Sequence, residues 1–395
     1  MIVPQSTRLD QFQEYFFATA NRIIAETEKE TGKKVLNLGI GSPDLPPKQE
    51  VVEYLKKELD DPLNHRYPTY TGDISLRKAI SAYYAQRFSV QIDPNTEILP
   101  LIGSKEGLVN VCFAFMNPGD VALIPNPGYP AYTAGPLLAD GSVLSYPLNE
   151  KNHWLPNLAE IEKLDLSKVK IWWIGYPNNP TGAVATKKNM ALWVQFARKH
   201  NILLLYDNPY AEVYFTKTRP SSIMEIPGAK DIAIEFNSLS KTYNLAGWRI
   251  GMAISSAPYI QTFLKVKSNI DTGIFTALQK AAAFAIEHTD EKWLLQRNTV
   301  YKERRDLVCR SLKNMGFVCE VPEASLYVWA KSPVAHKKVE SLSFELIEHA
   351  QVFITPGTTF GSEGEGYFRI SLCQPKELIQ VAMERLEQYF KKYLV

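Results

Sequence analysis

The sequence predicts an α/β protein with a mostly parallel central sheet sandwiched by helices, together with a smaller α+β domain. The first part is predicted by apolar strand-like segments that alternate with helical segments between residues 98 and 254, several of them followed by Gly-, Pro- or Asn-rich turns. The second part is predicted by a long charged helix, 291–314, which leads into short strands and further helices. The 395 residues suffice for one large and one smaller domain. We expect the large domain at 46–285 and the small domain at 1–45 and 286–395.

Composition and charge exclude several classes of function. The chain has 45% hydrophobic and 22% charged residues, which is ordinary for a globular protein, and a net charge of +2 gives no reason to expect a nucleic-acid partner or an anionic membrane surface. No apolar run approaches the length of a membrane span, and the N-terminus has no secretory signal. The four cysteines form no CxxC pair and the six histidines are scattered. We therefore expect a cytoplasmic protein without a metal site.

The N-terminal third contains one possible anion site. Apolar residues at helical spacing predict helices at 12–29, 51–60 and 76–88. An apolar strand, 98–102, then runs into Gly103, Ser104 and Lys105 and a helix that ends near 116. The free backbone N–H groups at such a helix start bind anions. A tight strand-to-helix turn is the alternative, since no P-loop pattern is present.

Polar clusters follow three of the strands predicted next along the chain. These strands are expected at 121–124, 143–147, 170–174, 202–206, 232–236 and 248–254. Residues 176–182 follow the third of them, Asp207 to Tyr210 follow the fourth, and Lys241 follows the fifth. Because ligands bind at the carboxyl ends of parallel strands, we expect one shared site. Taken singly, Asn179 could be a turn residue and Asp207 a helix cap.

Lys241 has the surroundings of a nucleophilic lysine. Desolvation and nearby cations favour the free amine that such chemistry needs. Ser238, Ser240 and Arg249 can donate several hydrogen bonds to one dianion such as a phosphate. An amine beside a phosphate site indicates pyridoxal phosphate, which is a phosphorylated aldehyde. A surface lysine in a polar loop is the alternative.

Two further residues are candidates for contacting a ligand. Tyr129 lies in a loop stiffened by three prolines, where it could be an aromatic plate for a planar ring or a core-packing residue. Arg369 alternates with apolar residues in a predicted strand, where it could clamp a carboxylate or be an exposed edge charge. The other elements expected after the long helix are strands at 318–321, 325–330 and 367–372 and helices at 339–350 and 375–393.

With these residues placed, the sequence resembles the class I and II aminotransferases of the aspartate aminotransferase superfamily, which have fold type I. The motifs that carry the resemblance are 178–182, 207–210, 238–241, 247–251 and 367–371. Their order and spacing agree with the family, and the match covers nearly the whole chain. None of them departs from the family pattern.

The resemblance implies pyridoxal 5′-phosphate as cofactor and assigns roles to single residues. Lys241 is similar to the lysine that forms the Schiff base and then carries the proton, and Asp207 looks like the partner of the pyridine nitrogen. Tyr210 and Asn179 resemble the donors to the ring hydroxylate. The other implied cofactor contacts are Gly103, Ser104, Lys105, Tyr129, Ser238, Ser240, Arg249 and, from the neighbouring subunit, Tyr67.

The resemblance also implies an activity and an assembly. It implies ping-pong transfer between an amino acid of the alanine, aspartate or LL-diaminopimelate type and a 2-oxo acid such as 2-oxoglutarate or pyruvate. Arg369 would clamp the substrate α-carboxylate, assisted by Gly41 and Asn179. A homodimer with shared active sites is expected, in which Tyr67 and 267–271 face the neighbour's cofactor, and no nucleic acid or membrane is expected as a partner. A β- or γ-lyase of the same fold, for instance one that cleaves C–S bonds, is the alternative.

Overall fold

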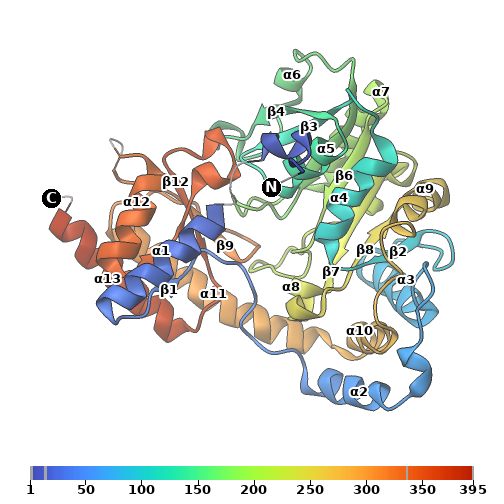
Figure 1. Cartoon of the computed structure of the whole chain (residues 1–395), viewed down its shortest axis with the longest axis horizontal. Helices are drawn as coiled ribbons and strands as arrows, with labels where there is room; N and C mark the ends of the chain where they lie inside the picture. The colour runs from blue at the N-terminus through green and yellow to red at the C-terminus, as the bar shows by residue number, and fades with distance from the viewer. Residues whose placement is uncertain (1–2, 13–15, 335–336, 394–395) are drawn as a thin grey trace.

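The structure is a computed structural model that describes residues 3–12, 16–334 and 337–393. Its main sheet has seven strands in the order β2-β8-β7-β6-β5-β3-β4 (Figure 1). β8 is antiparallel to both of its neighbours, and the other pairings are parallel. This confirms the mostly parallel sheet. The strands are β2 (Ile98–Leu101), β3 (Val121–Asn126), β4 (Ser142–Pro147), β5 (Val169–Gly175), β6 (Leu203–Asp207), β7 (Ala233–Ser238) and β8 (Gly251–Ile254).

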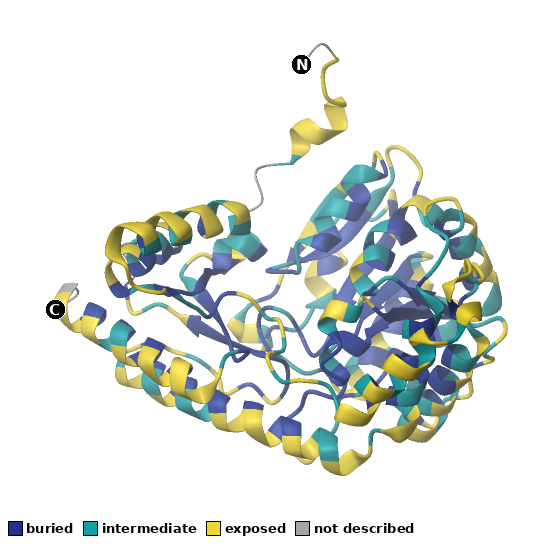
Figure 2. Cartoon of the chain, turned by 60° about the horizontal axis from the view of Figure 1, so that its bottom comes forward, coloured by how far each residue is buried: buried dark blue, intermediate teal, exposed yellow. Residues whose placement is uncertain are grey.

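Helices cover both faces of this sheet, as its continuously apolar strands require. Along β5, Ile171 and Trp173 pack into one core with residues of α4, α5 and α9, while Trp172 and Ile174 pack into another with α3, α7 and α10. Figure 2 shows the buried strands between helices whose outer sides are exposed. The helices of this part are α2 (Gln49–Leu59), α3 (Ile74–Phe88), α4 (Ser104–Phe115), α5 (Ala131–Leu138), α6 (Leu158–Ile161), α7 (Lys187–His200), α8 (Leu239–Thr242), α9 (Ala257–Lys267) and α10 (Thr276–His288).

The rest of the chain forms a smaller α+β unit, reached through the long helix α11 (Glu291–Asn314), whose bounds are those predicted (Figure 1). A three-stranded antiparallel sheet, β11-β12-β9, forms its centre, and β1 from the N-terminal part pairs with β10. Its elements are α1 (Phe16–Thr31), β1 (Leu36–Asn37), β9 (Tyr327–Lys331), α12 (Val339–Glu345), a π-helical turn (Leu346–Ala350), β10 (Val352–Phe353), β11 (Thr355–Pro356), β12 (Tyr367–Ser371) and α13 (Lys376–Tyr393). None of the described helices has the length and apolarity to cross a bilayer.

Two expected strands differ from the structure. The strand predicted at 318–321 is wrong: Val318 makes only an isolated bridge to Lys331, because Val318 and Val321 are exposed and Pro322 has no N–H to donate. The strand predicted from residue 248 begins only at Gly251, since a 3-10 turn and a left-handed residue precede it.

Candidate active site

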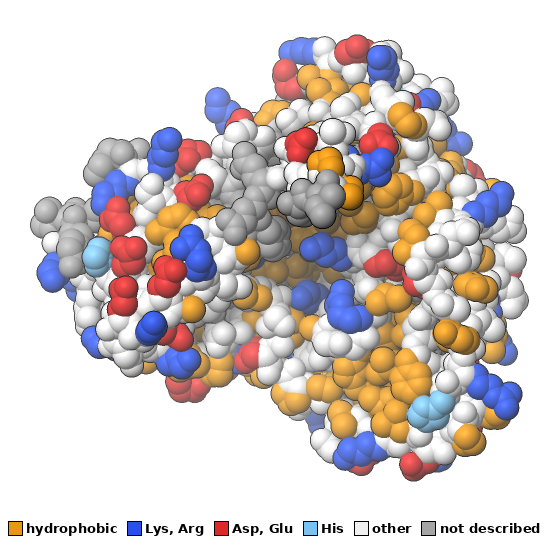
Figure 3. Space-filling model, viewed as in Figure 1, with side chains coloured by type: hydrophobic (Ala, Val, Ile, Leu, Met, Phe, Trp, Pro, Cys, Tyr) orange, Lys and Arg blue, Asp and Glu red, His pale blue; other side chains and the backbone are white. Residues whose placement is uncertain are grey.

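A cavity of about 400 Å³ lies between the carboxyl edge of the main sheet and the smaller unit. Figure 3 shows the molecule hollowed near its centre, with Lys and Arg side chains inside the hollow. Most of the residues predicted for the site line this cavity, namely Gly41, Ser104, Lys105, Tyr129, Asn179, Asp207, Tyr210, Ser238, Ser240, Lys241, Arg249 and Arg369. Residues from distant parts of the sequence thus meet in one place.

The register of three neighbouring strands brings the polar clusters together. Gly175 at the end of β5 lies opposite Asp207 at the end of β6, and Asp207 in turn lies opposite Phe236 near the end of β7. The chain leaves each strand at the same edge of the sheet, so Asn179, Asp207 and Lys241 all reach the cavity.

Lys241 sits in α8, the short helix that begins directly after β7. Ser238 caps this helix, because its Oγ accepts a hydrogen bond from the Ser240 N–H at 3.2 Å. The Lys241 Nζ donates to the Gly41 carbonyl at 2.6 Å. Behind the helix, the buried Arg297 donates to the carbonyl of Lys241 at 3.0 Å. Hydrogen bonds therefore hold both the side chain and the backbone of Lys241.

Asp207 has one carboxylate oxygen that lacks a partner. Its Oδ2 accepts from the Tyr132 hydroxyl at 2.8 Å, whereas Oδ1 is buried and makes no hydrogen bond. Burial raises the pKa of Asp207 to about 7, although the Tyr132 hydroxyl acts against this rise. Tyr132, which stacks on Trp173 at 4.9 Å, was not among the predicted residues. An unpaired carboxylate oxygen beside a cavity suits a protonated nitrogen of a bound ligand.

A second group of residues at the cavity provides donors for an anion. Gly103 has a φ of +72°, and a Cβ at this position would lie 2.1 Å from Nη2 of Arg249, so only glycine lets the two approach. Arg249 itself has a left-handed φ of 57°, and its Nη1 donates to the Ala246 carbonyl at 2.9 Å. The start of α4 at Ser104 adds backbone N–H groups without intrahelical acceptors. This donor set suits a phosphate.

Arg369 is buried, so the alternative of an exposed edge charge is wrong. Its strand, β12, lies between β11 and β9, and only 4% of the residue is exposed. Its Nη1 donates to Asn179 Oδ1 at 2.9 Å, and its Nη2 donates to the Gly39 carbonyl at 2.7 Å. The guanidinium carbon lies 4.0 Å from the ring centroid of Tyr327 and 4.6 Å from that of Phe360. The planar fork is held in a fixed orientation, as binding of a carboxylate requires.

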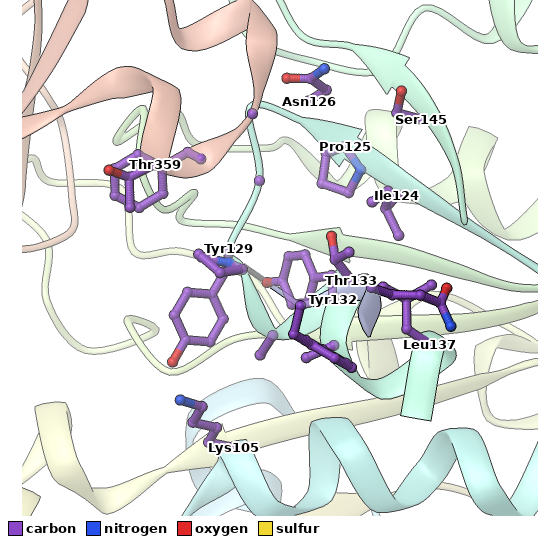
Figure 4. A pocket seen from close by; sticks show the side chains of 18 residues that line it. Lys105, Ile124, Pro125, Asn126, Tyr129, Tyr132, Thr133, Leu137, Ser145 and Thr359 are labelled. Carbon is purple, nitrogen blue, oxygen red and sulfur yellow. The ribbon is translucent and has the colours of Figure 1, made fainter. Parts of the chain in front are cut away.

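A second cavity of about 440 Å³ adjoins the first. The residues that line both are Lys105, Tyr129, Pro130, Tyr132 and Phe360. Figure 4 shows the second cavity, with the side chain of Lys105 pointing toward the ring of Tyr129. Its wall also carries the uncharged polar side chains of Gln11, Asn126, Ser145 and Thr359. The site therefore has room beyond what a bound cofactor would occupy.

Two predicted residues lie elsewhere. Tyr67 is 88% exposed and does not line the cavity of its own chain. Lys267 ends α9 and is buried, with its Nζ 2.7 Å from Asp271 and 3.5 Å from Glu106. The ammonium of Lys267 thus pairs with carboxylates of its own chain, and the expectation that 267–271 face a neighbour's cofactor stays a prediction. Among the described residues, no group of three or more His, Cys, Asp or Glu side chains could hold a metal ion.

Comparisons with known proteins agree with this geometry. The family described as aminotransferase class I and II matches residues 33–386. The chain is 44% identical over 387 residues to the LL-diaminopimelate aminotransferase of Dehalococcoides mccartyi strain CBDB1, with 98% of this chain and 99% of that protein covered. It is 43% identical over 382 residues to the Aquifex aeolicus protein of the same name, with 97% and 98% covered. Among solved structures, ligand-free BacF from Bacillus subtilis matches with a TM-score of 0.93 and 35% identity over 98% of both chains.

Proposed function

The chain belongs to the family of class I and II aminotransferases and has the fold type I architecture, and we propose that it transfers an amino group from LL-diaminopimelate to a 2-oxo acid with pyridoxal phosphate as cofactor. The observation that supports the cofactor best is the unpartnered, buried Oδ1 of Asp207 in the same cavity as a group of donors suited to an anion. The relatives compared above are named aminotransferases, so the lyase alternative is not favoured.

The residues around the cavity suit this cofactor. Pyridoxal phosphate, when bound, supplies an aldehyde carbon that takes up amino groups and a protonated ring that accepts electron density. Asp207 Oδ1 would accept the hydrogen bond of the ring N–H and keep that nitrogen protonated. Tyr210 and the amide nitrogen of Asn179 would donate to the ring oxygen, because Arg369 already occupies the amide oxygen of Asn179. Tyr129 would stack on the ring. The phosphate donors would be Gly103, Ser104, Lys105, Ser238, Ser240 and Arg249.

Lys241 and Arg369 would act on the substrate. The two parallel N–H donors of Arg369 bind the α-carboxylate and so place the α-carbon within reach of Lys241. The Lys241 Nζ then takes the proton from the α-carbon, and its present partner, the Gly41 carbonyl, can orient the free amine again afterwards. The rings of Tyr327 and Phe360 lie against the guanidinium, where they exclude water and strengthen this carboxylate contact.

The substrate is proposed from the relatives and from the space in the site. LL-diaminopimelate carries a second amino group and a second carboxylate at its far end. The adjoining cavity, with its uncharged polar side chains, gives a long substrate room past Tyr129 and Lys105. Alanine or aspartate would leave this space to water.

We also propose a homodimer with shared active sites and the two-domain division given above, 46–285 against 1–45 with 286–395. Tyr67 is 88% exposed, and the apolar or aromatic residues Leu63, Tyr70 and Ile270 are exposed as well. Figure 3 shows apolar side chains gathered over the region of α2 and α10. A second copy that covers these residues would bury the patch and place Tyr67 at the neighbouring phosphate site.

A donor panel tests the substrate. The purified enzyme, loaded with pyridoxal phosphate, is given LL-diaminopimelate, its meso isomer, alanine, aspartate or glutamate, with 2-oxoglutarate or pyruvate as acceptor. We expect kcat/KM for LL-diaminopimelate to exceed that of alanine, aspartate and glutamate by at least about tenfold, because only a diaminopimelate is long enough to reach the second cavity. The meso isomer, which has the same length, tests whether the site distinguishes the configuration at the far end. A faster reaction with alanine or aspartate would contradict the substrate but leave the family untouched. Release of ammonia without transfer would favour the lyase instead.

A further inference from the structure

Tyr327 is a buried residue of the site that no sequence motif indicated. It lies in β9 opposite Ser371 of β12, is 4% exposed and lines the cavity. Its hydroxyl and its ring contact two residues with different roles in the proposed function, Tyr210 and Arg369. The two contacts use separate parts of one side chain, so they can be tested separately.

The hydroxyl of Tyr210 donates to the hydroxyl oxygen of Tyr327 at 3.2 Å, and the two can exchange these roles when a ligand accepts from Tyr210. A tyrosine hydroxyl can both donate and accept. Once Tyr210 donates its proton to the ring oxygen of a bound cofactor, its own oxygen is left to accept, and the Tyr327 hydroxyl is the donor already in contact. A donated hydrogen bond polarises the O–H of Tyr210 and makes it a stronger donor.

The Tyr327 hydroxyl also lies close to Gly41, the residue whose carbonyl accepts a hydrogen bond from Lys241. A Cβ added at Gly41 would lie 1.9 Å from the Tyr327 hydroxyl oxygen, so only glycine leaves room for it. The carbonyl of Gly41 is the acceptor for Lys241 Nζ at 2.6 Å. Tyr327 therefore fixes the spacing between the loop at Gly41 and the hydroxyl of Tyr210.

The ring of Tyr327 holds the arginine. The guanidinium carbon of Arg369 lies 4.0 Å from the ring centroid, and Phe360 also approaches it, at 4.6 Å. Contacts between a buried guanidinium and aromatic faces are attractive and restrict the plane of the fork. Without the Tyr327 ring, the guanidinium would keep its hydrogen bonds to Asn179 and Gly39 but would lose the nearer of the two rings that restrict its plane.

We propose that Tyr327 is a positioning residue with two separable parts: its hydroxyl directs Tyr210 at the cofactor ring oxygen, and its ring holds Arg369 for the substrate carboxylate. This inference rests on the proposed function, because it assumes that pyridoxal phosphate occupies the cavity.

Three variants test it. Tyr327→Phe removes only the hydroxyl, and Tyr327→Leu removes the ring as well. Tyr146→Phe is the matched control, because Tyr146 is equally buried and its hydroxyl donates to the Trp173 carbonyl, away from the cavity. The first measurement is the absorbance of bound pyridoxal phosphate against pH without substrate, and the second is the split between KM and kcat for the best donor of the panel.

The two parts predict different results. Tyr327→Phe should raise the pH at which the bound cofactor loses its proton by about half a unit to one unit, a threefold to tenfold gain in proton affinity, because a weaker hydrogen bond to the ring oxygen favours the anionic form less. Its KM should stay within about twofold of wild type, since Arg369 keeps its ring. Tyr327→Leu should show the same shift and, in addition, a KM raised about tenfold. Tyr146→Phe should titrate as the wild type does.

The outcomes separate this inference from the proposed function. A wild-type protein without a titrating chromophore would overturn both. A wild-type chromophore that titrates, with the same midpoint in Tyr327→Phe, would overturn the role of the hydroxyl alone. Equal KM values in Tyr327→Phe and Tyr327→Leu would overturn the role of the ring. If the leucine variant does not fold, the titration of the phenylalanine variant still decides the first part.

Discussion

Replacing Asp207 by asparagine should stabilise the cofactor-free protein near pH 8 while it impairs the loaded enzyme. Burial raises the pKa of Asp207 from 3.8 to about 7, and its Oδ1 has no hydrogen-bond partner. A carboxyl group whose folded pKa lies above its unfolded pKa holds its proton more tightly in the folded state. The stability that this proton contributes is therefore complete below about pH 4 and is lost as the pH rises to about 7. Asparagine has nearly the same shape and does not ionise.

The size of the effect follows from the two pKa values. The interval from 3.8 to about 7 is about three pH units, which at about 1.4 kcal/mol per unit corresponds to at most about 4 kcal/mol at pH 8. The unfolding entropy of a 395-residue chain is about 0.8 kcal/mol per kelvin at about 2.1 cal/mol/K per residue. The cofactor-free variant should thus unfold up to about 5 °C above the wild type at pH 8, and the gain should vanish toward pH 4.

Calorimetry of the dialysed, cofactor-free proteins between pH 4.5 and 8.5 measures this difference. Glu235→Gln is the matched control, because burial also raises the pKa of Glu235 to about 7, yet both of its oxygens are satisfied. Its Oε1 accepts from Tyr84 and Asn208, and its Oε2 accepts from Ser222. The glutamine NH₂ would meet donors there, so this variant should lose stability at every pH. An Asp207→Asn protein that is no more stable than wild type at pH 8, or a gain that persists at low pH, would refute the reasoning.

The remaining predictions concern the loaded enzyme. Asp207→Asn should lower kcat by about 10²- to 10³-fold with little change in KM, because the contact matters most where charge develops on the ring. Lys241→Ala should abolish turnover, and borohydride treatment of the wild type should fix the cofactor on Lys241; a peptide map with the cofactor on another lysine would contradict the assignment. Arg369→Lys should lower kcat/KM about 10- to 100-fold despite its conserved charge, since lysine offers no parallel donors; near-normal values for every donor would rule the clamp out. Refolding Tyr67→Ala together with Lys241→Ala should restore about a quarter of wild-type activity per site, because about half the dimers are mixed and one of their two sites is whole. The same proteins mixed without subunit exchange are the control, and equal activity in both mixtures would mean that Tyr67 serves no neighbouring site.

The main sheet and the ends of its strands were predictable because they depend on local patterns. Alternating or continuous apolar residues fix β5, β6 and β7, and the polar residue that follows each strand must emerge at the same edge. The bounds of α11 were predicted because Asp290 caps its start and charged residues run through its length. By contrast, α10 was not predicted, since an alanine-rich helix that is buried over much of its surface shows little amphipathic contrast.

The parts of the site that could not be predicted depend on contacts between distant residues. The hydroxyl contact of Tyr132 with Asp207 joins positions 75 residues apart, and that of Tyr327 with Tyr210 joins positions 117 apart. Nothing near either tyrosine in the sequence separates it from a core-packing residue, because its function depends on which side chain the fold places beside its hydroxyl. Tyr132 comes three residues after Tyr129 in the sequence, at the start of α5, and this proximity was the only available signal.

The long helix α11 makes hydrogen bonds to both units near the cavity. Near its start, the buried Arg297 donates to the carbonyl of Lys241 at 3.0 Å. Two turns further on, Arg304 binds both carboxylate oxygens of Asp44, at 2.7 and 2.9 Å, and the carbonyl of Leu372 at 3.0 Å. Asp44 lies three residues after Gly41, which lines the cavity, and Leu372 directly follows β12, the strand that contains Arg369. A continuous helix is stiff over this distance, so these two arginines connect the backbone of Lys241 in the large unit to the end of β12, which carries Arg369, in the small one.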